Sequence, residues 1–408
     1  MANIILKSAL TVEEKINLMR QDALFDVADD DGACMPDLSA IRKEIKAKPA
    51  PPTVPKIFLS NDCLFNCAYC GCRAGNENRQ CYTNTPKELA DIAVNEANRN
   101  GHGIFISSAI FKTADYTTEL IIDTLKHIRM AHGYKGYVHA KIMPGTDPGL
   151  IRLAGLYANR LSVNIEVAKS EGYAQIARNK TRENILTPMR QISELIKNAT
   201  QERSRFAPRF ATSQTTQLMA GSTGENDYEI LRLAKAMYHK YALKRVYYTP
   251  FQYKKPVKGY QHLTPTSTPV WRMKRLYQAD RLMELYGFTP EEITPDTAPN
   301  LLSDFDPKAA WALRNLHLYP VEVNTADYEL LLRVPGIGTV FAERIIKARQ
   351  YCKITHDILK ALGVALKRSK HFITCNGKYI GEKKEDENKY RLILFSPLDN
   401  SNFIEDCG

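Results

Sequence analysis

The sequence has no long hydrophobic run. No stretch of its 408 residues approaches the roughly 20 apolar residues of a transmembrane helix. The N-terminus, Met1 to Lys7, also lacks the charged start and the long apolar segment of a signal peptide. We therefore expect a cytoplasmic protein that makes no contact with membranes. A hydrophobic content of 44% is ample for packed cores, and the length suggests two or three domains.

Acidic residues are too few to balance the basic ones. The chain has 45 Asp and Glu residues against 56 Lys and Arg residues, which gives a formal net charge of +11. A positive field attracts polyanions, and nucleic acid is the usual partner of such a chain. Charge alone does not decide this, because a basic enzyme in a ribosome-rich cytosol would show the same balance.

The nine cysteines lack the distribution of a secreted disulfide framework. Five of them fall within one short stretch, which indicates metal chemistry in a reducing compartment: Cys63, Cys67, Cys70, Cys72 and Cys81. The other four are scattered, and we expect them to be buried or free thiols: Cys34, Cys352, Cys375 and Cys407.

Cys63, Cys67 and Cys70 form a C-x3-C-x2-C run with Tyr69 just before the last cysteine. Three thiolates on one loop can hold three irons of a [4Fe–4S] cube and leave the fourth iron without a protein ligand. Zinc sites usually pair two C-x2-C hooks at a distance, and the chain has no second hook. A zinc site completed by Cys72 or Cys81 remains an alternative.

Apolar strand-like runs alternate with helical patterns after a proline-rich linker at 49–55. Helices are expected at 86–99 and 117–131, and six strands at 56–60, 103–107, 136–142, 161–167, 206–212 and 245–249. This order predicts an α/β fold, with a parallel sheet and helices outside it. Barrel-like sheets place their chemistry at the C-terminal ends of the strands, and the cysteine loop directly follows the first strand.

The cysteine spacing and the position of Tyr69 resemble the cluster loop of the radical S-adenosylmethionine (radical SAM) superfamily. The resemblance implies a TIM-like, partial (β/α)6 barrel with a [4Fe–4S] cluster after its first strand. It also implies that the open iron chelates the amino and carboxylate groups of SAM. An electron supplied by an external donor such as flavodoxin or ferredoxin would then split the sulfonium and release a 5′-deoxyadenosyl radical.

The same resemblance suggests contacts for SAM beyond the cluster, although Ser107, Ser108 and Ala109 stand where the family often has Gly-Gly-Glu. Asn164 and Glu166 alternate with apolar residues on the fourth strand and would hold the ribose hydroxyls. Arg178 and Lys180 would pair with the SAM carboxylate, with a solvated loop as the alternative. The stretch 217–225 loosely resembles the family's adenine-contacting segment. The expected cofactor contacts are therefore Tyr69, Ser107, Ser108, Asn164, Glu166, Arg178, Met219 and Gly221.

A second motif lies at 323–349, where a capped helix runs into Val334-Pro335-Gly336-Ile337-Gly338 and a second helix begins at once. Gly336 and Gly338 permit a tight hairpin, and amides at the start of a helix suit a phosphate. Arg344 and Lys347 would add positive charge. The segment resembles the helix-hairpin-helix motif of DNA repair and processing proteins, which holds the sugar–phosphate backbone without reading sequence. A hairpin used only for packing or for a protein contact is the alternative.

Together the two motifs resemble the radical SAM proteins assigned to DNA modification or repair, a family linked to uracil-DNA-glycosylase-like partners. The implied enzyme would act on an extruded nucleotide of DNA. An RNA-modifying radical SAM enzyme, a non-catalytic iron–sulfur protein that recruits a glycosylase-like partner, and a zinc-bound nucleic-acid protein remain alternatives. The expected parts are a helical segment (1–50), the barrel (51–262), a linker with helices (263–320), a small all-α helix-hairpin-helix domain (321–366) and a tail with a short hairpin (367–408).

Overall fold

A computed structural model describes the chain in seven ranges: 10–23, 56–76, 79–100, 103–202, 209–253, 256–381 and 387–398. The linker expected at 49–55, and Cys34 and Cys407, lie outside these ranges. The chain divides into two compact units. The first takes the chain up to Glu225 together with Ala236–Thr268, and the second takes Asn226–Lys235 and the chain from Pro269 to Ser401. None of the helices within the described ranges is both long and apolar enough to cross a bilayer.

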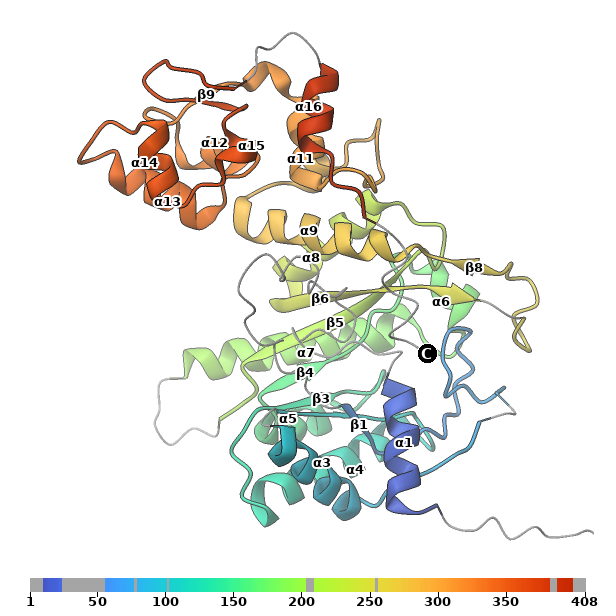
Figure 1. Cartoon of the computed structure of the whole chain (residues 1–408). Helices are drawn as coiled ribbons and strands as arrows, with labels where there is room; N and C mark the ends of the chain where they lie inside the picture. The colour runs from blue at the N-terminus through green and yellow to red at the C-terminus, as the bar shows by residue number, and fades with distance from the viewer. Residues whose placement is uncertain are drawn as a thin grey trace, which may run out of the picture. The chain divides into compact units, whose positions relative to one another are not determined.

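The first unit contains a parallel sheet whose six strands follow one another in chain order (Figure 1). Its strands are β1 (Lys56–Phe58), β2 (Ile104–Ser107), β3 (Val138–Lys141), β4 (Arg160–Ser162), β5 (Ser213–Ala220) and β6 (Leu243–Pro250). Every neighbouring pair is parallel, so each connection crosses back over one face before the next strand begins. The expected α/β fold with a barrel-type strand order is confirmed.

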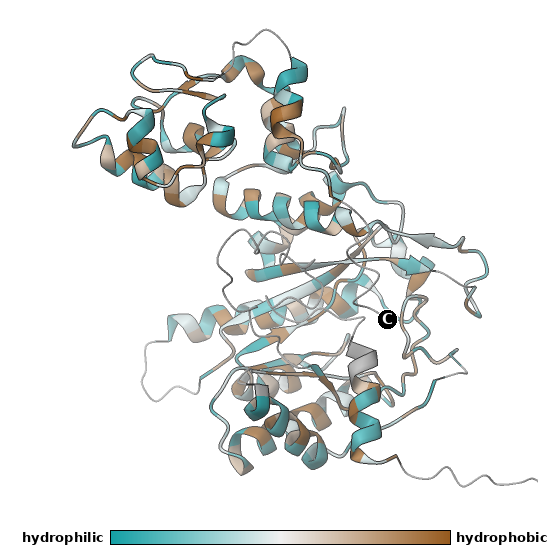
Figure 2. Cartoon of the chain, viewed as in Figure 1, coloured by the Kyte–Doolittle hydropathy of each residue, from teal (hydrophilic) through white to brown (hydrophobic). Residues whose placement is uncertain are grey.

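Helices connect the strands and pack against one another in sequence. They are α1 (Val12–Ala23), α3 (Pro86–Asn100), α4 (Ala114–Lys126), the π-helical turn η1 (His127–Ala131), α5 (Pro148–Tyr157), α6 (Glu171–Ile176), α7 (Arg182–Gln201) and α8 (Asp227–Tyr241), the last divided between the units. Helix α3 contacts α4, α4 contacts α5, and α5 contacts α7. Several helices carry hydrophobic and hydrophilic stretches side by side (Figure 2). Strands β1 and β2 are buried along their whole length, as expected where helices cover a parallel sheet. A short antiparallel pair, β7 (Gln252–Tyr253) and β8 (Thr266–Ser267), follows β6.

The expected fifth strand was misplaced. The sequence suggested 206–212, whereas the strand is Ser213–Ala220. Its first half is polar yet buried, because its side chains bond to backbone groups inside the fold. Gln214 Nε2 donates to Met189 O at 2.9 Å, and Thr216 Oγ1 donates to Val163 O at 2.7 Å. Because the buried side chains of this strand are polar and form hydrogen bonds inside the fold, the strand shows no apolar periodicity. The prediction therefore placed the fifth strand on the preceding segment.

The fourth strand is shorter than expected. Regular pairing covers Arg160–Ser162, and the chain returns to the sheet only at Glu166, which makes a single parallel bridge to Leu218. Glu166 has a φ of 63°, a left-handed conformation that is uncommon for a residue with a side chain. Two bonds hold it there: Glu166 N donates to Gln217 O at 2.9 Å, and Met219 N donates to Glu166 O at 2.8 Å. The chain therefore bends at the position where the sequence suggested a straight strand.

The second unit is mainly helical. Its further elements are α9 (Val270–Tyr286), α10 (Pro290–Ile293), α11 (Pro307–Arg314), the 3₁₀ turn η2 (Leu316–Leu318), β9 (Val321–Glu322), α12 (Tyr328–Arg333), α13 (Thr339–Ala348), α14 (His356–Ala361), α15 (Leu366–Ser369), β10 (Ile373–Thr374) and α16 (Glu387–Leu394). Strands β9 and β10 pair in parallel. Asn376 and Gly377 follow with φ values of 52° and 74°, and Cys375 bridges to Lys378, which gives the tight turn that an Asn-Gly pair favours.

Candidate functional site

A cavity of about 110 Å³ lies at the C-terminal ends of the parallel strands in the first unit. Five successive strands, or the segments that follow them, contribute to its lining. The loop after β1 contributes Cys63, Cys67, Tyr69, Cys70 and Cys72, and the loop after β2 contributes Ser108. The other polar lining residues are Lys141 from β3, Asn164, Glu166 and Lys180 from the segment after β4, and Gln217 from β5. This is the end of a barrel-type sheet where side chains from different strands converge. The cavity is therefore the candidate active site.

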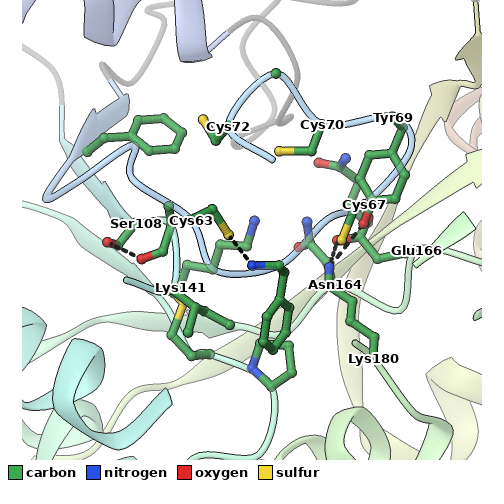
Figure 3. A pocket seen from close by; sticks show the side chains of 18 residues that line it. Cys63, Cys67, Tyr69, Cys70, Cys72, Ser108, Lys141, Asn164, Glu166 and Lys180 are labelled. Atoms are coloured by element: carbon green, nitrogen blue, oxygen red, sulfur yellow. Dashed lines mark hydrogen bonds and ion pairs between the residues drawn. The ribbon is translucent and has the colours of Figure 1, made fainter. Parts of the chain in front are cut away.

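Backbone bonds hold the cysteine loop at the mouth of the sheet. Leu64 N donates to Ile110 O at 2.7 Å, which ties the loop to the segment after β2. Ala68 N donates to Ile176 O at 2.8 Å, which ties it to the end of α6. As a result, the side chains of Cys63, Cys67 and Cys70 border one common space (Figure 3).

The three thiols of the loop share one cavity. A [4Fe–4S] cube binds each thiolate to a different iron, so its ligands are spread around a cavity. Cys63, Cys67 and Cys70 all line the same cavity, which fits this requirement.

A cysteine binds metal as the thiolate, and the surroundings of these cysteines shift the thiol pKa in different directions. Burial raises the pKa of Cys67 to about 12. A hydrogen bond from the Cys72 side chain lowers the pKa of Cys70 to about 7. The positive charge of Lys180 acts on both thiols in the direction of the thiolate. The site therefore brings a cation to the place where anionic sulfur is needed.

Lys180 and Glu166 form a buried ion pair at the edge of the cavity. The Nζ–Oε1 distance is 2.8 Å, and the two side chains are 11% and 3% exposed. Lys180 Nζ also donates to the hydroxyl of Tyr69 at 3.0 Å. Burial acts to lower the pKa of Lys180, but the charges of Glu166 and of the Cys67 thiolate outweigh burial and raise the pKa above its ordinary value. Lys180 is thus a fixed positive charge beside the cysteine loop.

A buried carboxylate oxygen of the cavity lining, Glu166 Oε2, has no hydrogen-bond partner within the described part of the chain. Buried acceptors are nearly always satisfied in folded proteins, so an unsatisfied one marks a group that a bound molecule would meet. Together with the left-handed backbone of Glu166, this indicates a site shaped for a polar ligand.

The structure gathers some of the sequence-derived contacts and leaves others outside the cavity. Tyr69, Ser108, Asn164 and Glu166 line it, as do Lys141 and Gln217, which the sequence had not singled out as contacts. Ser107, Arg178, Met219 and Gly221 are not among its lining residues. The position of Lys141, at the end of a predicted strand, was a signal that could have revealed it.

Each of these outlying residues has another environment. Arg178 is exposed, with its guanidinium 5.1 Å from the centre of the Tyr260 ring. Gly221 has a φ of 80° and leaves no room for a Cβ beside Thr268. In the same loop, the carboxylate of Glu225 accepts hydrogen bonds from the amides of Ser222 at 3.1 Å and Thr223 at 2.8 Å. The 217–225 segment therefore closes on itself with its own carboxylate.

The structure places the two cysteines that the sequence left unexplained in different environments. Cys72 is buried and lines the cavity. Cys81 is exposed, and its Sγ lies 3.2 Å from Arg79 Nε, outside the cavity lining. Only Cys72 shares the space of the three candidate ligands.

In the second unit, α12, a short turn and α13 form the expected helical hairpin. Gly336 has a φ of 92°, so a residue with a side chain would be strained in this turn. Ile337 is buried, whereas Arg344 and Lys347 are exposed. The N-cap of α13 is Gly338, which offers no side chain to the first-turn amides. Those amides are therefore available to an anion.

The hairpin pattern recurs in the next two helices. Helix α14 leads into Gly363, with a φ of 87°, and α15 follows. Val364 is buried after Gly363, as Ile337 is after Gly336. Thr355 caps α14 by accepting a hydrogen bond from Ile358 N.

The two hairpin glycines pack against each other's second helix. A Cβ on Gly336 would lie 3.2 Å from Ser369 N, in α15. A Cβ on Gly363 would lie 3.3 Å from the ring of Phe341, in α13. Arg344, also on α13, donates to Leu362 O at 2.9 Å, at the end of α14. Arg344 therefore joins the two hairpins in addition to being exposed.

Two solved structures show distant likenesses to the chain. One is the FeFe-hydrogenase maturase HydG from Carboxydothermus hydrogenoformans, at 16% identity and a TM-score of 0.44, covering 68% of this chain and 60% of that chain. Another is the radical S-adenosylmethionine methyltransferase TsrM from Kitasatospora setae, at 10% identity and a TM-score of 0.35, covering 49% of this chain and 37% of that chain. The chain thus spans less than two thirds of the length of either structure. No curated protein matches it.

Two family models match separate parts of the chain. The model of the radical SAM superfamily matches residues 57–237, which include the sheet up to β5 and all the cavity residues named above. The model of the helix-hairpin-helix motif matches residues 319–357, which include α12, the Gly336 turn and α13. The chain therefore contains a radical SAM superfamily domain, from a class of enzymes that use a [4Fe–4S] cluster and S-adenosylmethionine, and a helix-hairpin-helix motif.

Proposed function

We propose that the chain is a radical SAM enzyme that modifies or repairs DNA. The observation that carries the proposal is the cavity in which Cys63, Cys67 and Cys70 meet at the strand ends, in a chain that also contains a helix-hairpin-helix motif. A [4Fe–4S] cluster with bound SAM supplies a 5′-deoxyadenosyl radical able to abstract hydrogen. The net charge of +11 supports a polyanionic substrate.

Each group around the cavity has a role in this proposal. Cys63, Cys67 and Cys70 hold three irons. Glu166 and Asn164 accept hydrogen bonds from the ribose hydroxyls of SAM, and Ser108 offers its hydroxyl to the amino group. The apolar part of the lining limits access of water: Phe58, Phe65, Ala109, Ile110, Met143 and Pro144.

The hairpin supplies the hold on nucleic acid. The first-turn amides of α13 bind a backbone phosphate, and Lys347 adds positive charge from the same helix. This contact carries no sequence information, so the choice of substrate belongs to the cavity. A base reaches the cavity only if it leaves the stack or is single-stranded already.

Two protein partners complete the proposal. The C-x3-C-x2-C run provides ligands for one cluster, so the reducing electron comes from an external donor such as flavodoxin or ferredoxin. A uracil-DNA-glycosylase-like protein is the proposed partner in repair.

The decisive experiment is anaerobic reconstitution of the full chain with iron and sulfide, followed by addition of reductant and SAM. We expect 5′-deoxyadenosine to form, and its yield to rise with DNA more than with RNA of the same length. Absence of 5′-deoxyadenosine under every condition would refute an enzymatic role and favour a recruiting protein. Stimulation by RNA alone would favour the RNA-modifying enzyme.

Val340 offers a test of the hairpin as the nucleic-acid contact. Its side chain is 55% exposed in the first turn of α13. We expect Val340→Asp to weaken binding to duplex DNA about tenfold or more, because the new carboxylate repels phosphate. An acidic residue in a first turn stabilises a helix, so folding should be preserved. Fluorescence anisotropy with a labelled duplex measures the change.

A matched control exists in the first unit. Val12 is 53% exposed and also lies in the first turn of a helix. Val12→Asp adds the same charge at a similarly exposed valine in the first turn of another helix and should leave DNA binding at the wild-type level. Equal binding by the two variants would show that the hairpin of α12 and α13 does not contact the DNA.

A further inference from the structure

A second groove borders the hairpin within the second unit. It has a volume of about 360 Å³ and is bordered by the turn Pro335–Gly338, by α9 and by residues at α11 and α15. Three basic side chains face it, one from each of these helices: Arg281, Lys308 and Arg368. No family match or expected contact includes Arg281 or Lys308.

The single carboxylate in the groove lining is already engaged. Asp306 caps α11 by accepting a hydrogen bond from Ala309 N at 2.9 Å, and it pairs with Arg368 at 2.9 Å. Arg281 is exposed and has no hydrogen bond or ion pair with the described residues. Because Asp306 is paired with Arg368, Arg281 and Lys308 remain as the two basic side chains of the groove that have no carboxylate partner in a hydrogen bond or ion pair among the described residues.

Lys308 links this groove to the hairpin. Its Nζ donates to Ile337 O at 2.5 Å and lies 5.0 Å from the centre of the Tyr286 ring. An ammonium has three donors, so one bond to a carbonyl leaves it able to bind an anion as well. Burial lowers the pKa of Lys308 to about 7, and a phosphate in the groove would favour its charged form. The turn that leads into the first-turn amides of α13 is thus also in contact with Lys308.

We propose that this groove binds a second phosphodiester of the nucleic-acid backbone, beside the one held by the hairpin, through Arg281 and Lys308. The proposal rests on the proposed function of the hairpin. In this proposal the second unit binds two phosphates rather than one. Helices α9 and α11, outside the helix-hairpin-helix motif, supply the contact to the second phosphate.

The test is the salt dependence of duplex binding by the full chain. Each phosphate contact contributes about 0.9 to the slope of log K against log salt concentration. We expect Arg281→Ala to reduce the slope by about 0.9 and to weaken binding about tenfold, the effect of losing one charged hydrogen bond. Arg281→Lys keeps the charge and should restore most of the slope.

Arg391→Ala is the matched control. Arg391 is a half-exposed arginine of α16 that pairs with Glu387 and does not line the groove, so its loss removes the same charge elsewhere in the unit. If Arg281→Ala and Arg391→Ala give equal slopes while Val340→Asp weakens binding about tenfold or more, the groove proposal is refuted and the hairpin proposal stands. If the wild type binds no DNA, both fall together.

Inorganic phosphate separates a backbone site from a site for small phosphates. A small-phosphate site would bind inorganic phosphate tightly, lose it in Arg281→Ala, and leave the DNA slope unchanged. That outcome would overturn the proposal. Weak phosphate binding together with a reduced DNA slope supports it.

Discussion

Replacing Cys67 with serine is expected to prevent assembly of the [4Fe–4S] cluster and to reduce 5′-deoxyadenosine formation at least about 100-fold. Changes to residues that merely support metal ligands cost 10–100-fold, and the loss of a ligand itself should cost more. A serine hydroxyl is a harder ligand than a thiolate and is poorly matched to iron–sulfur clusters. Iron and sulfide content after anaerobic reconstitution gives a readout that does not depend on catalysis.

Cys81→Ser is the matched control, because Cys81 belongs to the same group of five cysteines but is exposed and lies outside the cavity lining. It should keep wild-type iron and sulfide. Cys72→Ser, which changes a buried thiol in the cavity, should keep the cluster as well. A Cys67→Ser protein with full iron content and undiminished product would remove Cys67 from the ligand set.

Replacing Lys180 with methionine is expected to destabilise the first unit by about 3 kcal/mol, because it leaves the buried carboxylate of Glu166 without its cation. Urea unfolding followed by circular dichroism measures the loss. Lys87→Met is the control: Lys87 pairs with Asp91 at 3.6 Å, but both side chains are exposed. Such a surface pair contributes at most about 1 kcal/mol.

The double variant Glu166→Gln, Lys180→Met separates stability from function. Removing both charges should recover most of the lost stability, since a neutral pair leaves no uncompensated buried ion. SAM binding should stay impaired, because the carboxylate proposed to hold the ribose is gone. Wild-type SAM affinity in the folded double variant would show that the pair is purely structural.

The chemistry of the site was visible in the sequence because its main signal is local. Cys63, Cys67 and Cys70 lie on one loop, and their spacing together with Tyr69 carries the resemblance to the radical SAM superfamily. The apolar runs at 56–60 and 103–107 were equally local. The observed strands are Lys56–Phe58 and Ile104–Ser107, so the segments that lead into the cysteine loop and Ser108 were placed to within two residues.

The remainder of the site depends on contacts between distant segments. Lys141 and Gln217 meet in the cavity only because β3 and β5 belong to one sheet. The place of Lys141 at a predicted strand end was a usable signal, whereas Gln217 lies inside a strand that the sequence did not predict. The polar strand Ser213–Ala220 was missed because its buried side chains are satisfied by backbone groups that only the folded chain brings near. Arg178 was expected to pair with the SAM carboxylate because it follows the fourth strand, yet it is exposed and its guanidinium lies over the Tyr260 ring.

The reciprocal packing of Gly336 and Gly363 has a consequence for how the hairpins open. The Gly336 turn packs against α15, which follows the Gly363 turn, and the Gly363 turn packs against α13, which follows the Gly336 turn. Local unfolding of either hairpin would therefore remove packing contacts from the other. Segments coupled in this way open together and report one shared free energy in hydrogen exchange. The protection of amides near Gly336 is thus set partly by residues around Ser369, beyond the end of the family match at residue 357. The cooperative element that contains α13 is accordingly larger than the helix-hairpin-helix motif matched at residues 319–357.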